Sequence, residues 1–242
     1  MRRRFFVDRF SGNSAVLGGD AAHHLSGVLR AAPGQLYELS DGSAAWLARI
    51  TSASRNRVEF ALLEQLPAPP PAADATLLLS VIKFDAFEWA LEKATELGVA
   101  HLVPLAAARS EKHLLAAAAK RSVRWRKILV ESSQQCRRLS LPQLAAPCKP
   151  AQAFAAQKGK CCILLSERPG APSLRSVLSA EPAASQAFAL AIGPEGGWTD
   201  DELASARSSG FREASLGSLI LRAETAVISA LAVLNFVLSA PS

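Results

Sequence analysis

Residues 187–203 read Ala-Phe-Ala-Leu-Ala-Ile-Gly-Pro-Glu-Gly-Gly-Trp-Thr-Asp-Asp-Glu-Leu, and this stretch decides the fold. Its first six residues are apolar, which is typical of a buried parallel strand. Thr199 and Glu202 have the spacing of a capping box at the start of a helix. The glycine-rich residues 193–197 are therefore predicted to form a loop at the carboxyl edge of an α/β sheet, where such sheets bind ligands. Glu195 lies in that loop, either facing a ligand or as a solvated carboxylate.

A second glycine-bearing segment, residues 216–226, reads Leu-Gly-Ser-Leu-Ile-Leu-Arg-Ala-Glu-Thr-Ala and also leads into a helix-like pattern. Glycine lets backbone amides approach a ligand closely. Neither segment contains the GxxxxGK[ST] phosphate loop, and Gly193 begins no GxGxxG motif. The two segments together predict a ligand site that differs from the common nucleotide-phosphate loops.

Around these loops, residues 75–242 alternate strand-like and helix-like patterns, which predicts an α/β sheet. Strands are expected at 76–82, 102–105, 161–165 and 187–192, and helices at 84–97, 120–135 and 174–178. The last segment, 224–238, is apolar nearly all round. A helix of that kind is buried, either in the core or against another subunit.

Residues 1–66 are instead predicted to form a small β-barrel-like domain with one short helix. Strands are expected at 5–7, 36–39, 45–50 and 58–63, with a hairpin turn at Asp41-Gly42 and a helix at 21–29. Residues 67–74 contain four prolines and are predicted to form a stiff linker. The domain boundary is therefore placed in that segment.

Charge is unevenly distributed along the 242 residues. The chain carries 27 basic and 21 acidic residues, a net charge of +6. Residues 109–138 contain nine basic and two acidic residues, a net charge of +7, so the rest of the chain is close to neutral. The stretch is either a solvated helix face or a surface that attracts phosphate backbones.

The cysteines and the apolar segments favour a cytoplasmic protein over a secreted or membrane-spanning one. None of the four cysteines has CxxC spacing, which favours buried thiols in a reducing cytoplasm over disulfides or a metal site. The basic N-terminus lacks a long apolar segment, so no signal peptide is expected. The most apolar stretch, 226–238, is too short to span a bilayer, and no membrane partner is expected.

The two glycine segments and four further motifs, in order along the chain, resemble those of the RsmE family of ribosomal RNA methyltransferases in the SPOUT superfamily. The family's start is similar to Arg3-Arg4-Phe5-Phe6-Val7, and its N-terminal motif to His24-Leu25-x-x-Val28-Leu29-Arg30 with Gly34. The start of the family's catalytic domain is matched by Lys93-Ala94-Thr95-Glu96-Leu97-Gly98-Val99, with Pro104 and Arg109-Ser110. The family's next motif is matched by Glu131, Gln135, Arg138 and Pro142. The two glycine segments complete the match, although Leu219 stands where the family usually has arginine.

The resemblance implies an N-terminal PUA-like β-barrel that binds RNA and a C-terminal α/β domain with a trefoil knot that binds S-adenosyl-L-methionine. Periodicity could not predict a knot, because knots are very rare in proteins. The resemblance also implies a cytoplasmic homodimer joined through the last helix. The implied reaction is methylation of N3 of a uridine in 16S rRNA, in the decoding region of the small ribosomal subunit, without a metal.

The resemblance also places site residues. The methyl-donor pocket is implied to contain Leu165, Gly193, Glu195, Gly196, Gly197, Leu216, Gly217, Ile220, Leu221 and Thr225. Uridine N3 must lose a proton, so a cation near O2 and O4 would help, and Arg222 is the first candidate. Glu195 or Glu224 is the candidate proton acceptor. Alternatively, Arg222 and Glu224 form a structural ion pair.

Seven arginines are candidate RNA contacts: Arg2, Arg3, Arg4 and Arg30 in the first domain, and Arg109, Arg137 and Arg138 in the second. Leu219 keeps a second function open, namely methylation of another RNA site or atom. A third possibility is an RNA-binding assembly factor without catalysis, although the intact glycine segments argue against it.

Overall fold

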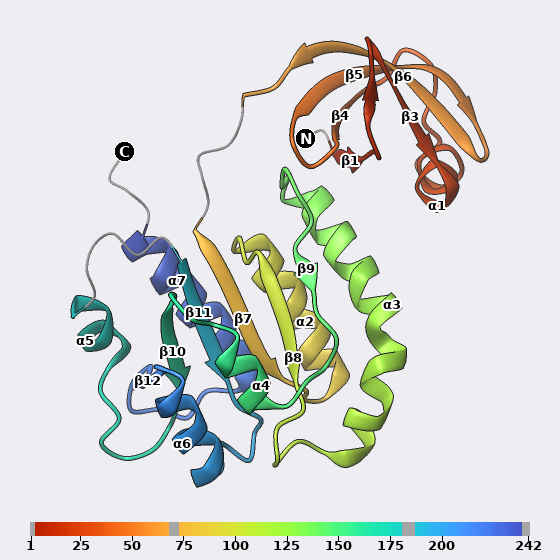
Figure 1. Ribbon diagram of the computed structural model, residues 1–242. Helices are drawn as coiled ribbons and strands as arrows, with labels where there is room; N and C mark the ends of the chain where they lie inside the picture. Colours follow the sequence, from red (N-terminus) through yellow and green to blue (C-terminus); the bar gives the residue numbers. More distant parts are fainter. Residues whose placement is uncertain (1–2, 68–72, 181–186, 239–242) are drawn as a thin grey trace. The chain divides into compact units, whose positions relative to one another are not determined.

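The computed structural model describes residues 3–67, 73–180 and 187–238 (Figure 1). These residues form two compact units. The first contains residues 3–67 and 130–141, and the second contains the other described residues. Most of the predicted linker, residues 68–72, lies outside the described residues. No pattern in the sequence predicts that 130–141 belongs to the first unit.

The first unit is a curled six-stranded sheet with the strand order β1-β4-β5-β6-β3-β2 (Figure 1). Strands β1 and β4 are parallel, and the other neighbours are antiparallel. Two register shifts between β5 and β6 break the regular ladder, and irregularities of this kind bend a strand. The elements are β1 (Arg4–Phe6), β2 (Phe10–Ser11), β3 (Ser14–Gly18), α1 (Gly19–His23), the π-helical turn η1 (His24–Val28), β4 (Leu36–Ser40), β5 (Ala45–Ser54) and β6 (Arg57–Gln65).

The predicted hairpin between β4 and β5 is confirmed, and Asp41 explains its turn. Asp41 Oδ1 accepts hydrogen bonds from Ser43 N and Ala44 N, each at 2.9 Å. Gly42 has a φ of +90°, a conformation that glycine adopts without a steric penalty. Local bonds within the turn therefore set how the two strands pair.

Arg4 is buried in the first unit and ties the segment 130–141 to it. Its guanidinium pairs with Glu38 at 2.9 Å. It also donates to the main-chain oxygens of Arg137 at 2.6 Å and Arg138 at 3.3 Å. The prediction that Arg4 contacts RNA is therefore wrong, because a buried guanidinium with these partners does not reach a phosphate.

The second unit contains a six-stranded sheet with the strand order β12-β10-β11-β7-β8-β9, in which all neighbours are parallel. Its strands are β7 (Asp74–Ser80), β8 (His101–Leu105), β9 (Gln143–Leu144), β10 (Cys161–Leu165), β11 (Ala187–Ile192) and β12 (Arg212–Ala214). The helices are α2 (Phe84–Glu96), α3 (Lys112–Gln135), α4 (Pro150–Ala155), α5 (Leu174–Ser179), α6 (Asp200–Ser208) and α7 (Ala223–Leu238). The α/β alternation predicted for this part of the chain is confirmed.

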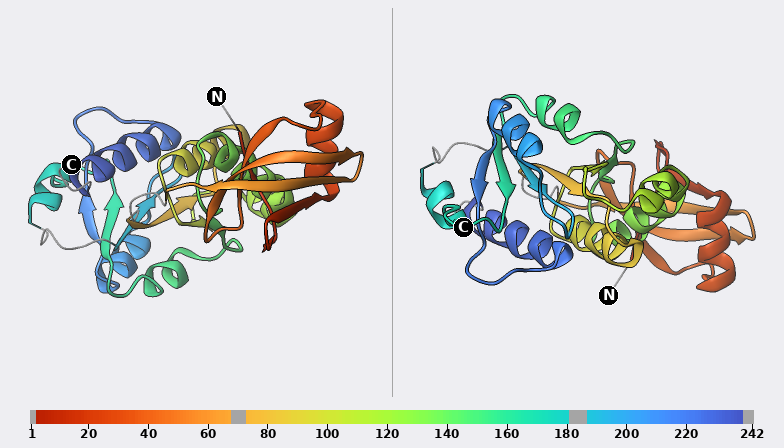
Figure 2. Two further views of the ribbon diagram at one scale, coloured as in Figure 1. Left: turned by 90° about the horizontal axis from the view of Figure 1, so that it is seen from above. Right: turned by 90° about the horizontal axis from the view of Figure 1, so that it is seen from below.

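Helices cover both faces of the parallel sheet (Figure 2). Leu77 of β7 lies in a buried cluster with Phe87 of α2 and Leu231 of α7. Its neighbour Leu78 lies in a second cluster, with Phe154 of α4 and Leu203 of α6. Burial on both faces explains why the strand is a continuous apolar run rather than an alternating one.

Helix α3 begins earlier than predicted, at Lys112 rather than at residue 120. Its buried side contains Leu114, Ala118, Trp125 and Leu129. Residues 116–119 are all alanine, a residue found both in cores and on surfaces. The alternation of apolar and polar residues that would predict a helix is therefore missing from this segment. The short elements β9, α4 and β12 also have no predicted counterpart, whereas β10 and β11 have the predicted bounds.

Candidate active site

A cavity of about 380 Å³ lies at the carboxyl edge of the parallel sheet. The loops that follow β10, β11 and β12 converge there because parallel strands end at the same edge. The start of α7 and the loop after β8 complete its wall. The lining residues are Arg109, residues 165–168, 192–198 and 215–223, and Ala226.

The first glycine loop packs against the buried indole of Trp198. A Cβ atom on Gly193 would lie 3.1 Å from Trp198 Cε2 and Nε1, so a larger residue would displace the ring. The indole is itself fixed, because Nε1 donates a hydrogen bond to Leu165 O at 2.9 Å. Glycine at this position therefore lets the loop lie close to the end of β10.

The next two glycines form a tight turn beside Arg109. Gly197 N donates to Pro194 O at 2.8 Å, and Gly197 has a φ of +70°. A Cβ on Gly196 would lie 3.2 Å from Arg109 Cβ. Arg109 Nη1 also donates to Gly196 O at 2.8 Å. The side chain of Arg109 thus occupies the space that glycine leaves free.

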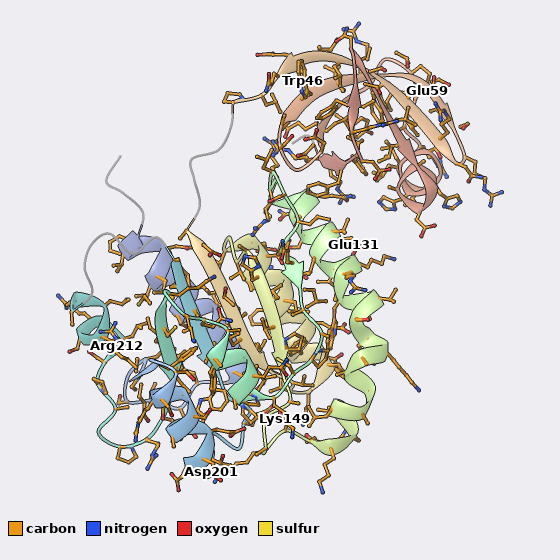
Figure 3. The ribbon with its side chains drawn as sticks, viewed as in Figure 1. Trp46, Glu59, Glu131, Lys149, Asp201 and Arg212 are labelled. Carbon is orange, nitrogen blue, oxygen red and sulfur yellow. The ribbon has the colours of Figure 1, made fainter. Side chains whose placement is uncertain are left out.

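Helix α6 begins directly after this loop, and its predicted capping box is confirmed. Thr199 Oγ1 accepts from Glu202 N, while Glu202 Oε2 accepts from Thr199 N at 2.9 Å. Asp200 and Asp201 add negative charge to the first turn, which the helix N-terminus favours, and Asp201 projects outward (Figure 3). Glu202 Oε1 also accepts from Ala108 N at 2.8 Å, which joins α6 to the loop after β8.

The second glycine loop is shaped by Ser215. Its Oγ accepts a hydrogen bond from Gly217 N at 3.2 Å and donates to Gly217 O at 3.0 Å. Gly217 has a φ of +138°, which L-residues with a side chain rarely adopt. Beyond this turn, Leu219 and Ile220 are each 79% exposed although both line the cavity.

Of the predicted donor-pocket residues, all line the cavity except Thr225, which lies on α7 and is exposed. Arg222 and Glu195 also line the cavity, but Glu224 does not. Among the described residues, no ion pair or hydrogen bond joins Arg222 to Glu224. The structure therefore brings Arg222 and Glu195 to one site and does not support the structural ion pair.

Glu167 and Arg168 also line the cavity, although neither is among the site residues predicted from the sequence. Arg168 Nη1 lies 3.3 Å from Asp200 Oδ1 in the first turn of α6. Both missed residues follow the apolar run 161–165, so their position directly after a predicted strand was the available signal. Loops after neighbouring parallel strands meet at one edge, and this rule applies to β10 as it does to β11.

Edge strand β12 carries a carboxylate next to this site. Burial acts to raise the pKa of Glu213, but hydrogen bonding to Ser166 and Arg207 outweighs it and holds the pKa below its usual value. Arg207 Nη2 lies 2.9 Å from Glu213 Oε2. Glu213 therefore stays ionised and links β12 to α6.

The predicted RNA contacts at the start of the chain have different surroundings. Arg3 is exposed, and its Nη1 lies 3.5 Å from His24 Nε2. Arg30 is exposed with a φ of +51°, which is uncommon for a residue other than glycine. Arg2 lies outside the described residues. Arg3 and Arg30 thus have the exposure that a phosphate contact needs.

Arg137 and Arg138 lie just beyond α3 in the first unit. Arg137 Nη1 is 3.4 Å from Glu38 Oε1, so the same carboxylate serves Arg4 and Arg137. Burial lowers the pKa of the Arg138 guanidinium, whose Nε donates to Ser140 O at 3.2 Å. Arg138 therefore contributes to the packing of the first unit, whereas Arg137 is exposed and its predicted contact with RNA stays a prediction.

The described residues contain neither a metal-binding cluster nor a membrane-spanning helix. Within residues 3–67, 73–180 and 187–238, no group of three or more His, Cys, Asp or Glu side chains could hold a metal ion. Over the same ranges, none of the helices combines the length and the apolar character that crossing a membrane requires.

Comparison with known proteins defines the class to which this fold and cavity belong. The RNA methyltransferase domain family matches residues 69–235, which include the whole parallel sheet and the cavity. The chain therefore belongs to this family of RNA methyltransferases. The two sheets of the structure and its similarity to a solved structure over 98% of the chain confirm the fold class that the family resemblance implies, an α/β domain preceded by a barrel-like β unit.

Individual relatives carry a more specific name. Ribosomal RNA small subunit methyltransferase E of Synechocystis is 34% identical over 221 residues, covering 89% of this chain and 71% of that protein. The enzyme of the same name from Rickettsia conorii is 30% identical and covers 95% of this chain and 93% of its own. A Neisseria gonorrhoeae structure of that name, bound to S-adenosyl methionine, is 28% identical, has a TM-score of 0.86 and covers 98% of each chain.

Proposed function

We propose that this protein is an S-adenosyl-L-methionine-dependent methyltransferase that methylates N3 of a uridine in 16S rRNA. Its target lies in the decoding region of the small ribosomal subunit, and it acts in the cytoplasm. The observation that carries the proposal is the cavity of about 380 Å³ between the two glycine loops. The names of the relatives support the RNA substrate, and the ligand of the Neisseria gonorrhoeae structure supports the donor.

The residues around the cavity fit this donor. Leu165, Ile192 and Leu216 offer an apolar surface for an adenine ring, and the backbone of 193–197 offers polar groups for its edge. A Cβ at Gly193 would crowd Trp198 and one at Gly196 would crowd Arg109, so glycine at these two positions lets the loop backbone lie close against the cavity wall. When bound, the donor supplies an electrophilic methyl group on a sulfonium.

Gly193→Ala is expected to weaken donor binding by about 10-fold or more, because the cavity wall must shift to admit the new methyl group. Trp198 cannot yield freely, since its indole is held by Leu165 O. Calorimetric titration with S-adenosylhomocysteine measures the effect. Gly18→Ala is a matched control, because a Cβ there meets nothing within 4 Å. Equal affinity in both variants would contradict the assignment of the loop.

Uridine N3 carries a proton and is a poor nucleophile, so the protein must assist loss of that proton. Arg222 lines the cavity, and its guanidinium would stabilise the negative charge that develops on O2 and O4. Glu195 lines the same cavity and is the proposed proton acceptor. Glu224 is not proposed, because it does not line the cavity. N3 belongs to the Watson–Crick edge, so the target uridine must be unpaired or flipped.

The experiment that tests this function uses labelled S-adenosylmethionine and small ribosomal subunits that lack the modification, with nucleosides identified by mass spectrometry. Label in 3-methyluridine is the expected result, and it would show that the exposed Leu219 is compatible with this reaction. Label in another nucleoside would contradict the N3 assignment and support a different RNA site or atom. Binding of RNA and donor without transfer of label would support an assembly factor instead.

The first unit is proposed to be a PUA-like domain that binds the RNA. Arg3 and Arg30 are its exposed candidate contacts. The second unit has its own exposed candidate contacts on α3, namely Lys112, Lys120 and Arg126. Basic side chains of this kind bind phosphates irrespective of base sequence, so they would position the RNA rather than select it.

A homodimer through α7 is also proposed. The inner side of this helix is buried, with Val227, Leu231 and Leu234 in the core. Its outer side leaves Phe236 86% exposed and Val237 51% exposed. An aromatic side chain with that exposure on an apolar helix is typical of an interface between subunits.

Phe236→Glu is expected to convert the dimer to monomers, because a carboxylate would be buried without a partner in the proposed interface. Sedimentation equilibrium of the full chain measures the molecular mass. Trp89→Glu, on the exposed side of α2, is the control for a general effect of surface charge. A wild-type chain that sediments as a monomer, or a Phe236→Glu variant that sediments as a dimer, would reject this interface.

A further inference from the structure

Arg109 lies at the cavity rather than on a surface remote from it. It belongs to the loop that follows β8, and sequence analysis predicts it to be an RNA contact. The structure shows it as one of the residues lining the 380 Å³ cavity. The loop after β8 therefore forms a third wall of the site, beside the two glycine loops.

Two neighbouring hydrogen bonds fasten this third wall to the first glycine loop. Arg109 Nη1 donates to Gly196 O at 2.8 Å, and Ala108 N donates to Glu202 Oε1 at 2.8 Å. The aliphatic part of Arg109 also packs on Gly196, because a Cβ added to Gly196 would lie 3.2 Å from the Cβ of Arg109. The position of the guanidinium is thus set by contacts that do not depend on a ligand.

The guanidinium has N–H groups beyond the one that holds Gly196 O. An arginine side chain carries five N–H donors in a planar fork that matches a carboxylate. Two other arginines line the cavity, and Arg168 already pairs with Asp200. Arg222, next to the exposed Leu219, is proposed to serve the target base. Arg109 is therefore the cation placed beside the backbone of the first glycine loop.

We propose that Arg109, held by Gly196 O, forms a subsite for the carboxylate of the methionine part of the methyl donor. The inference rests on the proposed function and adds a positioning residue to it. The donor's carboxylate is the one anionic group of that molecule, and a charge-assisted bond to arginine is stronger than a bond between neutral groups. Arg109 would fix that end of the donor, while the apolar wall holds the adenine.

The test compares two ligands that differ in the amino-acid end of the donor. S-adenosylhomocysteine carries that end, with its carboxylate and ammonium groups, and 5′-methylthioadenosine has a methyl group on sulfur in its place. Only the carboxylate can accept hydrogen bonds from a guanidinium. Calorimetric titration of the full-length Arg109→Ala variant is expected to show about 10- to 100-fold weaker binding of S-adenosylhomocysteine. Binding of 5′-methylthioadenosine should change less than about threefold. Arg109→Lys should recover part of the loss, because it keeps the charge without the fork.

Arg175→Ala is the matched control, since Arg175 is an exposed arginine of α5 that does not line the cavity. It should leave the affinity for both ligands unchanged. Equal losses of both ligands in Arg109→Ala would overturn the proposal and show that the residue acts only through the shape of the loop. Unchanged donor affinity with weakened RNA binding would overturn it in favour of an RNA contact. If the wild-type chain bound neither ligand, the proposed function itself would fail.

Discussion

Arg222→Ala is expected to lower kcat by about 100- to 1,000-fold, the usual effect of removing one group that stabilises a developing oxyanion. Arg222 is exposed and lines the cavity, and the described structure shows no hydrogen bond or ion pair from its side chain. Its loss should therefore leave the unfolding free energy nearly unchanged. Single-turnover transfer of label to small ribosomal subunits, with thermal unfolding measured in parallel, gives both quantities.

The comparison for this variant is Arg175→Ala, which removes an exposed arginine of α5 that does not line the cavity. Arg175→Ala should keep the wild-type kcat, whereas Arg222→Lys should keep part of it because the charge remains. If Arg222→Ala retained full turnover in a stable protein, Arg222 would have no part in the chemistry. The exposed cation would then be one of the phosphate contacts.

Arg4→Ala is expected to lower the unfolding free energy of the first unit by about 3 kcal/mol, the lower end of the cost of breaking a buried ion pair. Among the described residues, the buried Glu38 would keep only the exposed Arg137, at 3.4 Å, as a partner. The side chains of Arg4 and Glu38 are only 9% and 10% exposed. The carbonyls of Arg137 and Arg138 would lose a donor as well. Urea denaturation followed by fluorescence measures the change.

Two further variants separate the buried pair from surface charge. Arg57→Ala removes an exposed ion pair with Glu59 and should cost less than about 1 kcal/mol. Combining Arg4→Ala with Glu38→Ala should recover part of the loss, because no unpaired charge is then buried. Arg4→Ala with wild-type stability would mean that the guanidinium does not hold the segment 130–141.

Local signals explain which parts of the fold can be predicted from this sequence. The strands β10 and β11 are apolar runs ended by a change in composition, and their bounds are predicted correctly. The capping box of Thr199 and Glu202 is confirmed because both partners lie within one turn. The glycine loop follows from these two signals, so most of the predicted donor-pocket residues line the cavity.

Features that depend on distant contacts could not be predicted in this way. Arg4 stands in a basic run that looks like a solvated terminus, yet its partners are Glu38 and two carbonyls more than a hundred residues further along. Arg109 stands in a basic stretch that suggests RNA binding, and only the position of Gly196 reveals its place at the cavity. For both arginines, the charge of the surrounding sequence predicts a contact with RNA phosphate. The structure instead pairs Arg4 with Glu38 and Arg109 with Gly196 O, partners that are distant in the sequence.

Helix α3 ends in a segment that the first unit needs. Residues 130–141 belong to that unit, and Ser40 Oγ donates to Leu139 O at 2.6 Å within it. During synthesis, β1 to β6 would therefore leave the ribosome before residues 130–141, which complete the first unit, had been made. Domains often fold in order from the N-terminus. Here the N-terminal unit would have to wait for sequence beyond β7, α2 and β8, and a fragment that stops before residue 130 should not reproduce its stability.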